Sequence, residues 1–224
     1  MKKIFALAAG MIALGSSYAA AQTDAPAIVQ RASVMYDLNV LSPKYVEDAY
    51  FNGFGVGYTA DFRVSNSLPL YVGTGLDLRT VFHSDKIVDT DDYNPADIKF
   101  NETLVNLNLP VNVSYRVPVA DSFYMTPKVG LDFRVQLYGH GKFTADGGRS
   151  EFVDEFLADN SSVDLFSKSD MGDAAYKRFQ MGWHAGVDFE YNRVNLGLSY
   201  GTDFVKIHKN VGGANFIVSV GYTF

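Results

Sequence analysis

The last ten residues of the chain alternate strictly between an apolar face and a face of small or polar side chains. The apolar positions are Phe216, Val218, Val220, Tyr222 and Phe224. A period of two indicates a β-strand, because successive side chains of a strand point to opposite sides of the sheet. Seven earlier segments show the same alternation. The sequence therefore predicts eight strands, at about residues 31–40, 51–64, 70–82, 99–117, 122–138, 176–191, 194–204 and 215–224.

The connections between these segments alternate in length. Short connections are expected at 65–69, 118–121 and 192–193, and long ones at 41–50, 83–98, 139–175 and 205–213. Short turns at one end and long loops at the other are typical of outer-membrane β-barrels, whose short turns are periplasmic. The pattern predicts an all-β fold, an eight-stranded antiparallel up-and-down transmembrane barrel with long extracellular loops.

Alternation alone does not decide which face points outward, because a soluble lipocalin-type barrel has the same period with the apolar face inside. Two features favour an apolar exterior. The polar face is rich in glycine, at positions Gly53, Gly55, Gly57, Gly73, Gly75, Gly197 and Gly201. Glycine weakens a solvent-facing strand, but it suits the narrow interior of an eight-stranded barrel. The apolar face is nearly unbroken and has Tyr and Phe towards the strand ends, as expected at membrane interfaces. A soluble periplasmic ligand-binding barrel remains the less favoured alternative.

The first 21 residues have the order of a secretory signal peptide. Lys2 and Lys3 precede an apolar run at 4–14, and small residues follow as far as Ala21. This run is too short to cross a bilayer as a helix. We expect cleavage near Ala21, then a short periplasmic segment at 22–30 and the barrel domain at 31–224.

Composition narrows the partners that the chain could have. Without Lys2 and Lys3, 17 basic residues remain against 25 acidic ones, which gives a net charge of −8. An acidic chain lacks the basic footprint that nucleic-acid binding requires. The absence of cysteine excludes disulfides, thiolate metal sites and a lipid-modified cysteine. We expect no cofactor.

The chain resembles the small outer-membrane β-barrel proteins of Bacteroidetes-type bacteria, a porin-family or PorT-like group. The signal peptide, the hairpin at 54–82, the segment at 107–111 and the closing segment Val220-Gly-Tyr-Thr-Phe224 carry this resemblance. It implies a fold and a location, the cell outer membrane, and not an activity. It also implies that Tyr222 and Phe224 form the signal read by the barrel-assembly machinery, although both side chains are equally expected as lipid-facing aromatics.

The face opposite the lipid carries many charges of both signs. These are Asp61, Arg63, Asp77, Arg79, Arg116, Lys128, Asp132, Arg134, Arg178, Asp188, Glu190 and Asp203, together with His184. Charges in a narrow interior must be paired, because unpaired buried charges are costly. We therefore expect a lumen filled by salt bridges. A narrow porin-like channel is the alternative, although a selective pore more often has a ring of one sign.

Catalytic and metal-binding interpretations have weaker support. His184 and Asp188 share a face but stand roughly 13 Å apart on a strand, so they cannot pair directly. Ser199 is a conceivable nucleophile for a lumen-rim hydrolase, but no motif places it beside His184. Three histidines, His83, His140 and His208, fall where strands meet long loops and are candidate metal ligands.

Two of the long loops have distinctive compositions. One carries Asp85, Asp89, Asp91, Asp92 and Asp97, an acidic cluster without the spacing of an EF-hand. Another contains an apolar stripe at residues 152, 153, 156 and 157, which would line one face of a short helix. Such a stripe packs either on the barrel rim or against an extracellular ligand or protein.

From these observations we expect a non-enzymatic outer-membrane barrel. Its role would be structural, or would be a surface interaction made through the extracellular loops. Its surroundings would be outer-membrane lipid. The sequence leaves the narrow channel, the lumen-rim hydrolase and the soluble binding barrel as alternatives.

Overall fold

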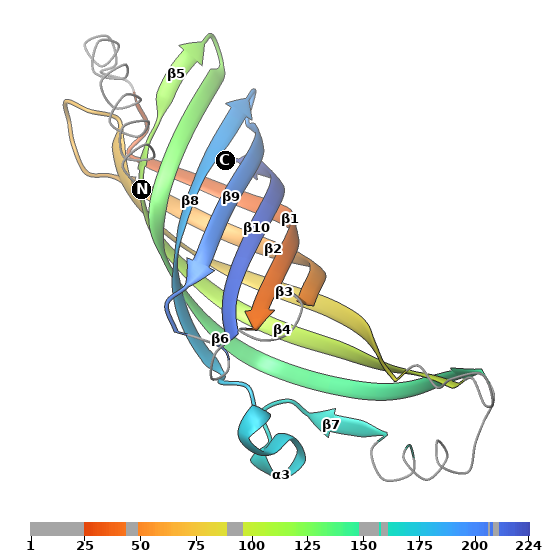
Figure 1. The fold of residues 1–224 in the computed structure, drawn as a ribbon. Coiled ribbons are helices and arrows are strands. Elements are labelled where there is room, and N and C mark those ends of the chain that lie inside the picture. The colour runs from red at the N-terminus through yellow and green to blue at the C-terminus, as the bar shows by residue number, and fades with distance from the viewer. Residues whose placement is uncertain are drawn as a thin grey trace.

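Eight antiparallel strands close into a ring in the computed structural model (Figure 1), which describes residues 25–43, 49–88, 96–147, 157, 161–205, 207 and 211–224. Around the ring the order is β4-β3-β2-β1-β10-β9-β8-β6, and pairing of β4 with β6 closes it. The ring strands are β1 (Ile28–Pro43), β2 (Ala49–Arg63), β3 (Leu70–Val88), β4 (Ala96–Tyr115), β6 (Phe123–Gly147), β8 (Phe179–Tyr191), β9 (Val194–Asp203) and β10 (Val211–Thr223). The predicted eight-stranded barrel is confirmed.

Four shorter elements accompany the ring. Strand β5 (Val117–Ala120) continues β4 after a break at Arg116 and pairs with β6, and β7 (Ser162–Asp164) pairs with β6 outside the ring. A single turn of helix, α3 (Lys168–Met171), is followed by a 3₁₀ turn, η2 (Gly172–Ala174). None of the helices among the described residues has the length and apolarity required to cross a membrane.

The tight turn between β8 and β9 has a clear local cause. Asn192 and Arg193 have φ values of 47° and 72°. Positive φ at both central residues defines a type I′ turn, whose twist matches that of the strands it joins. At this two-residue connection, the prediction from sequence is correct.

Several predicted strand ends are wrong. Strand β1 begins at Ile28, inside the segment expected to precede the barrel. The connection expected at 118–121 is largely strand β5, so the turn falls at Asp121 and Ser122. The loops expected at 83–98 and 139–175 are in part continuations of β3, β4 and β6, which stay paired as far as Ile98 opposite Val88 and Gly147 opposite Ala96. Outside the bilayer no face has to be uniformly apolar, so these extensions lack the alternation that reveals a strand.

The two faces of the ring have opposite polarity. Outward side chains such as Phe54 and Val34 are 67% and 62% exposed, whereas the inward side chains of Asp37 and Asn108 are 1% and 0% exposed. A barrel with an apolar exterior and a buried polar interior is built for lipid. This distribution is the reverse of that expected for the soluble barrel, and that alternative is wrong.

The extracellular end of the ring is closed by an apolar cluster, which we call the cap. Its buried members are Leu41, Phe51, Val81, Leu104, Leu165 and Ile207. The first four belong to the extracellular halves of β1 to β4. Leu165 and Ile207 come from the connections β6–β8 and β9–β10, so two segments that are distant in sequence pack over one mouth.

Beyond the cap, β3, β4 and β6 project from the barrel as a three-stranded sheet (Figure 1), which we call the ribbon. The ribbon has apolar packing of its own. Ile98 is 1% exposed and packs with Phe143, Ala145 and Leu157, and the rings of Phe100 and Phe143 lie 4.6 Å apart.

Candidate functional site

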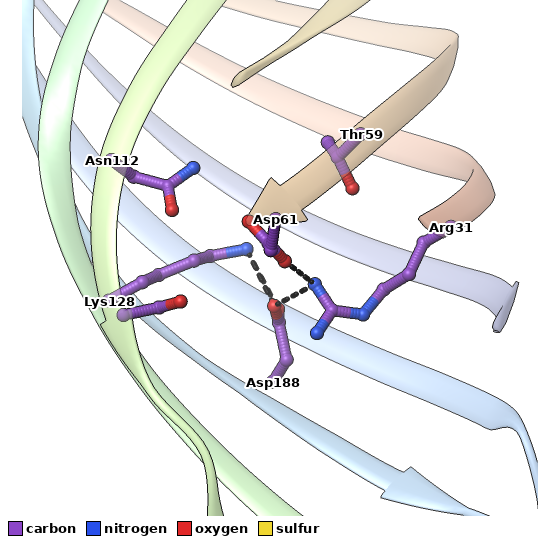
Figure 2. Close-up of a pocket in the computed structure, with 7 residues that line it drawn as sticks. Arg31, Thr59, Asp61, Asn112, Lys128 and Asp188 are labelled. Carbon is purple, nitrogen blue, oxygen red and sulfur yellow. Dashed lines mark hydrogen bonds and ion pairs between the residues drawn. The ribbon is translucent and has the colours of Figure 1, made fainter. Parts of the chain in front are cut away.

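Four charged side chains meet in the periplasmic half of the lumen (Figure 2). Arg31 Nη1 lies 2.7 Å from Asp61 Oδ2 and 3.5 Å from Asp188 Oδ2. Lys128 Nζ lies 2.8 Å from Asp188 Oδ1. Two cations therefore balance two anions drawn from β1, β2, β6 and β8, and the side chains tie opposite walls of the ring together.

A small cavity lies among these groups. It has a volume of about 20 Å³ and is lined by Arg31, Thr59, Asp61, Asn112, Ser114, Lys128 and Asp188 (Figure 2). The side-chain oxygens of Asn112 and Ser114 are buried without a protein hydrogen-bond partner. A space of this size holds about one water molecule. The cavity suits a single water that bridges polar walls, and it is too small for an organic ligand.

A second pair lies nearer the periplasmic opening. Arg116 Nη2 is 2.7 Å from Glu190 Oε1, and the hydroxyl of Thr223 donates to Glu190 Oε2 at 3.1 Å. The Arg116 guanidinium also lies 3.8 Å from the centroid of the Tyr124 ring. This end of the lumen is filled by paired charges.

A connected chain of hydrogen bonds crosses the middle of the lumen. Arg79 lies 2.8 Å from Asp77 and 3.4 Å from Asp37. The Asn108 amide donates to Asp77 at 3.3 Å and to Asp132 at 3.0 Å, and His184 Nδ1 lies 2.9 Å from Asp132 Oδ2. Five strands thus share one network: β1, β3, β4, β6 and β8.

On the extracellular side of this chain of hydrogen bonds, Arg134 forms the next layer of polar contacts. Its Nη1 lies 3.4 Å from Asp203 Oδ2 and donates to the Gln180 side chain at 3.1 Å. Gln136 donates to the same Gln180 oxygen at 3.3 Å. The polar filling therefore continues to the level at which the apolar cap begins.

The lumen aspartates lie opposite glycines. The paired positions are Asp37 with Gly53, Asp61 with Gly73, Asp77 with Gly57, Asp132 with Gly182 and Asp188 with Gly197. For Asp61, Asp77 and Asp188, the carboxylate occupies the space in which a Cβ on the opposite glycine would stand. The inward glycines therefore make room for the charges.

Eleven of the thirteen charged or histidine residues expected on the lumen face, all but Arg63 and Arg178, lie in these contacts. Arg63 donates to the carbonyls of Ala25, Asn66 and Leu68 at the periplasmic end. Arg178 is exposed and donates to the carbonyls of Gln136 and Leu137, with its guanidinium 4.1 Å from the centroid of the Phe166 ring. Both were expected in the network, and the structure places them at its ends.

Sequence reasoning missed Arg31 and Asp37, two central members. Both face inward on β1 and are 8% and 1% exposed. The signal was the alternation itself, since residues 31, 33, 35 and 37 share the inward face. The apolar Met35 interrupts that row and hides its polar character.

The catalytic and metal-binding candidates that the structure describes do not come together. No hydrogen bond joins Ser199 to His184 in the described part of the chain, and His184 pairs with Asp132 instead. The His83 ring stacks on Phe51, with centroids 4.7 Å apart, and the His140 ring on Tyr138. Within the described ranges, no three His, Asp or Glu side chains form a metal-binding group.

Much of the loop sequence lies outside the described residues. His208, Asp89, Asp91, Asp92 and residues 151–156 and 158 belong to these segments, and the side chain of Asp97 is likewise not described. Of the expected apolar stripe, only Leu157 is described, and it packs on Ile98.

The cap is held by specific backbone contacts. The Leu165 amide donates to the Gly139 carbonyl at 3.2 Å, and the Tyr176 amide donates to the Leu165 carbonyl at 2.8 Å. Leu165 is 0% exposed. The segment 161–178, which we call the lid, is therefore a folded layer over the mouth.

The described geometry, an apolar exterior around a charge-paired lumen, agrees with the family comparison. A family model described as the outer membrane protein β-barrel domain matches residues 5–224. The chain belongs to this outer-membrane β-barrel family. Its location is therefore the outer membrane of a Gram-negative cell, and its apolar exterior contacts lipid. No curated protein matches the sequence.

Three solved structures with a similar arrangement are distant in sequence. Ail of Yersinia pestis, solved with the heparin analogue sucrose octasulfate, is 14% identical, with a TM-score of 0.47 over 89% of this chain and 100% of that one. Neisserial surface protein A is 12% identical, with a TM-score of 0.37 over 89% and 98%. The outer membrane enzyme PagL is 8% identical, with a TM-score of 0.37 over 85% and 98%. At these values, the comparisons say nothing of what this chain binds or catalyses.

Proposed function

We propose that this protein is a non-conducting, non-enzymatic outer-membrane barrel that acts through its extracellular surface, in a structural or surface-interaction role. The observation that carries the proposal is the ribbon, an ordered sheet outside the membrane. Ile98, Phe100 and Phe143 give it apolar packing of its own. A packed projection of this kind holds a fixed surface away from the bilayer, where another molecule can reach it.

A narrow channel is the second candidate, because the lumen is lined by charge. Two features argue against conduction. The charges bind one another inside the lumen, with separations of 2.7 to 3.5 Å between paired atoms. The buried Leu165 and Ile207 then fill the mouth above them. An ion would have to break pairs and displace apolar side chains in order to pass.

An enzymatic role has less support, because a hydrolase needs a nucleophile within hydrogen-bond reach of its base. His184 is engaged by Asp132 deep in the lumen. The enzyme identity of one distant structural neighbour does not bear on this chain. The same holds for the heparin analogue bound to Ail, and an acidic chain gives no independent reason to expect a polyanionic ligand.

Several narrower assignments are also part of the proposal. Cleavage near Ala21 would leave a short periplasmic segment before the barrel. Tyr222 and Phe224, whose ring centroids lie 5.5 Å apart on the exterior, would form the signal for the barrel-assembly machinery. Membership of the PorT-like group rests on the sequence resemblance alone.

The test combines conductance with crosslinking on intact cells. A photoreactive amino acid is placed at Ser84, which is exposed on the ribbon, and in a matched control at Leu131, which faces lipid. We expect protein adducts from residue 84 and lipid adducts alone from residue 131, and a silent planar bilayer for the purified protein. A third variant tests whether the adducts at residue 84 require residues 87–98. It removes these residues by joining Lys86 to Lys99, which are directly paired, through an Asn-Gly turn. Conductance by the wild type, or identical adduct patterns at residues 84 and 131, would overturn the proposal.

A further inference from the structure

One carboxylate is buried in the cap with no Lys or Arg partner among the described residues. Glu102 lies on β4 between two inward positions: Leu104, a buried member of the cap, and Phe100, which packs against the cap. Its side chain is 6% exposed, and its partners in the sheet are His83 on β3 and Gly141 on β6. Such a group is costly to ionise, because apolar surroundings disfavour charge.

Glu102 lies above the lipid-facing band. On β3 the outward side chain of Phe82 is apolar, and the next outward position is Ser84. Ser84 donates to Asn101 at 2.8 Å, and Asn101 donates to Thr144 at 3.1 Å, so this level of the exterior is polar. The Glu102 carboxyl therefore belongs to the extracellular part of the barrel.

The contact that joins Glu102 to the lid is a single hydrogen bond. The hydroxyl of Tyr176 donates to Glu102 Oε1 at 3.1 Å. The charged or titratable side chains that influence Glu102 from the described part of the chain are Tyr176 on the lid and His83 and Asp85 on β3; no Lys or Arg is among them. One buried carboxyl of the barrel wall is thus in direct contact with the lid.

We propose that the lid is closed by acid, so that Glu102 holds a proton while segment 161–178 covers the mouth and releases it to water when the lid lifts. Burial raises the pKa of Glu102, against smaller lowering effects of the Tyr176 hydroxyl and His83. A raised pKa in the closed state means that the closed state binds the proton more tightly. Closure is therefore favoured at low pH and weakens as pH rises through the closed-state pKa. Between the open-state and closed-state pKa values, the ratio of open to closed lids rises by up to about tenfold per pH unit.

Thiol labelling of the otherwise cysteine-free chain measures this equilibrium. Met171→Cys places a thiol on a lid residue packed against the cap, and Ser162→Cys places one on the exposed strand β7 as a control. Both variants are labelled with a membrane-impermeant thiol reagent in lipid vesicles between pH 5 and 9. The ratio of their labelling rates removes the intrinsic effect of pH on thiol reactivity.

We expect this ratio to rise by at least threefold from pH 5 to pH 9 in the wild-type background. In Glu102→Gln, which keeps the shape of the side chain and removes its charge, the ratio should stay flat and low. Glu102→Met gives a second uncharged variant in case the glutamine amide disturbs the cap. A ratio that is flat in the wild type, or that still rises in both uncharged variants, would overturn the proposal, because another group such as His83 would then be responsible.

Discussion

Asp61 and Gly73 face each other across β2 and β3, and the Asp61 carboxylate occupies the space that a side chain at residue 73 would need. The same carboxylate binds Arg31 at 2.7 Å. A residue without a side chain on β3 thus makes room for a charge on β2, which in turn binds an arginine on the next strand, β1. The glycine-rich inner face and the salt-bridge network therefore depend on each other, because the glycines leave the space that the paired carboxylates fill.

Gly73→Ala should therefore destabilise the barrel. The new methyl group would displace Asp61 from Arg31, and overpacking of a filled interior costs about 1–3 kcal/mol. The measurement is urea unfolding of the folded protein in lipid vesicles. Gly212→Ala is the matched control, because a Cβ at that β10 glycine meets nothing within 4 Å. Equal stability of the two variants would contradict the role assigned to Gly73.

Removal of Arg31 alone should lower the free energy of unfolding more than removal of Arg31 and Asp61 together. Arg31→Met leaves Asp61 without a salt bridge and leaves Asp188 with Lys128 alone. Breaking a buried pair by removing one partner costs about 3–5 kcal/mol. The double variant Arg31→Met with Asp61→Asn should recover part of that loss. A double-mutant cycle measured by unfolding tests the coupling, and strict additivity of the two changes would show that the pair contributes nothing.

A charge on the lipid-facing surface should also destabilise the protein. Leu109 and Leu131 point outward and are 42% and 41% exposed. Arginine at either position should cost about 2–4 kcal/mol if the site lies near the bilayer midplane. Ser84→Arg, above the apolar band, is the control and should be neutral. Unfolding in vesicles measures all three variants, and neutrality at both leucine positions would contradict the apolar-out orientation.

The helical turn in the lid should itself loosen in stronger acid, below the pH 5–9 range in which Glu102 is expected to control closure of the lid. Asp170 accepts hydrogen bonds from the Asp164 amide and from the hydroxyls of Ser167 and Ser169, which lower the pKa of its carboxyl. A lowered pKa means that the stabilisation is present above the unfolded value, about 3.9, and is lost as pH falls through the folded value. Proteolysis within 161–178 should rise below about pH 4 in the wild type. In Asp170→Asn, cleavage should be faster and independent of pH in this range. If cleavage of the wild type does not change with acid, the role assigned to the Asp170 carboxylate in this helical turn is wrong.

The sequence by itself determined the barrel. Alternation in strands such as β2 and β10 is forced by physics, because one face must dissolve in lipid while every backbone group pairs with a neighbouring strand. The same constraint made Asn192-Arg193 recognisable as a tight turn and placed Asp61, Arg79 and Asp188 in the lumen. Any lipid-spanning strand has to carry this pattern in its own residues.

Only the tertiary structure decided which charges pair, how far the strands continue and what closes the mouth. Arg31 reaches Asp188 across 157 positions of sequence, and register, not local pattern, sets that contact. The extensions of β3, β4 and β6 lie outside the bilayer, where nothing forces alternation. Leu165 and Ile207 are buried because two distant connections meet over the lumen. The same packing buries the Glu102 carboxyl. Burial created by such long-range packing leaves no periodic signal in the chain, so it could not be predicted from the sequence.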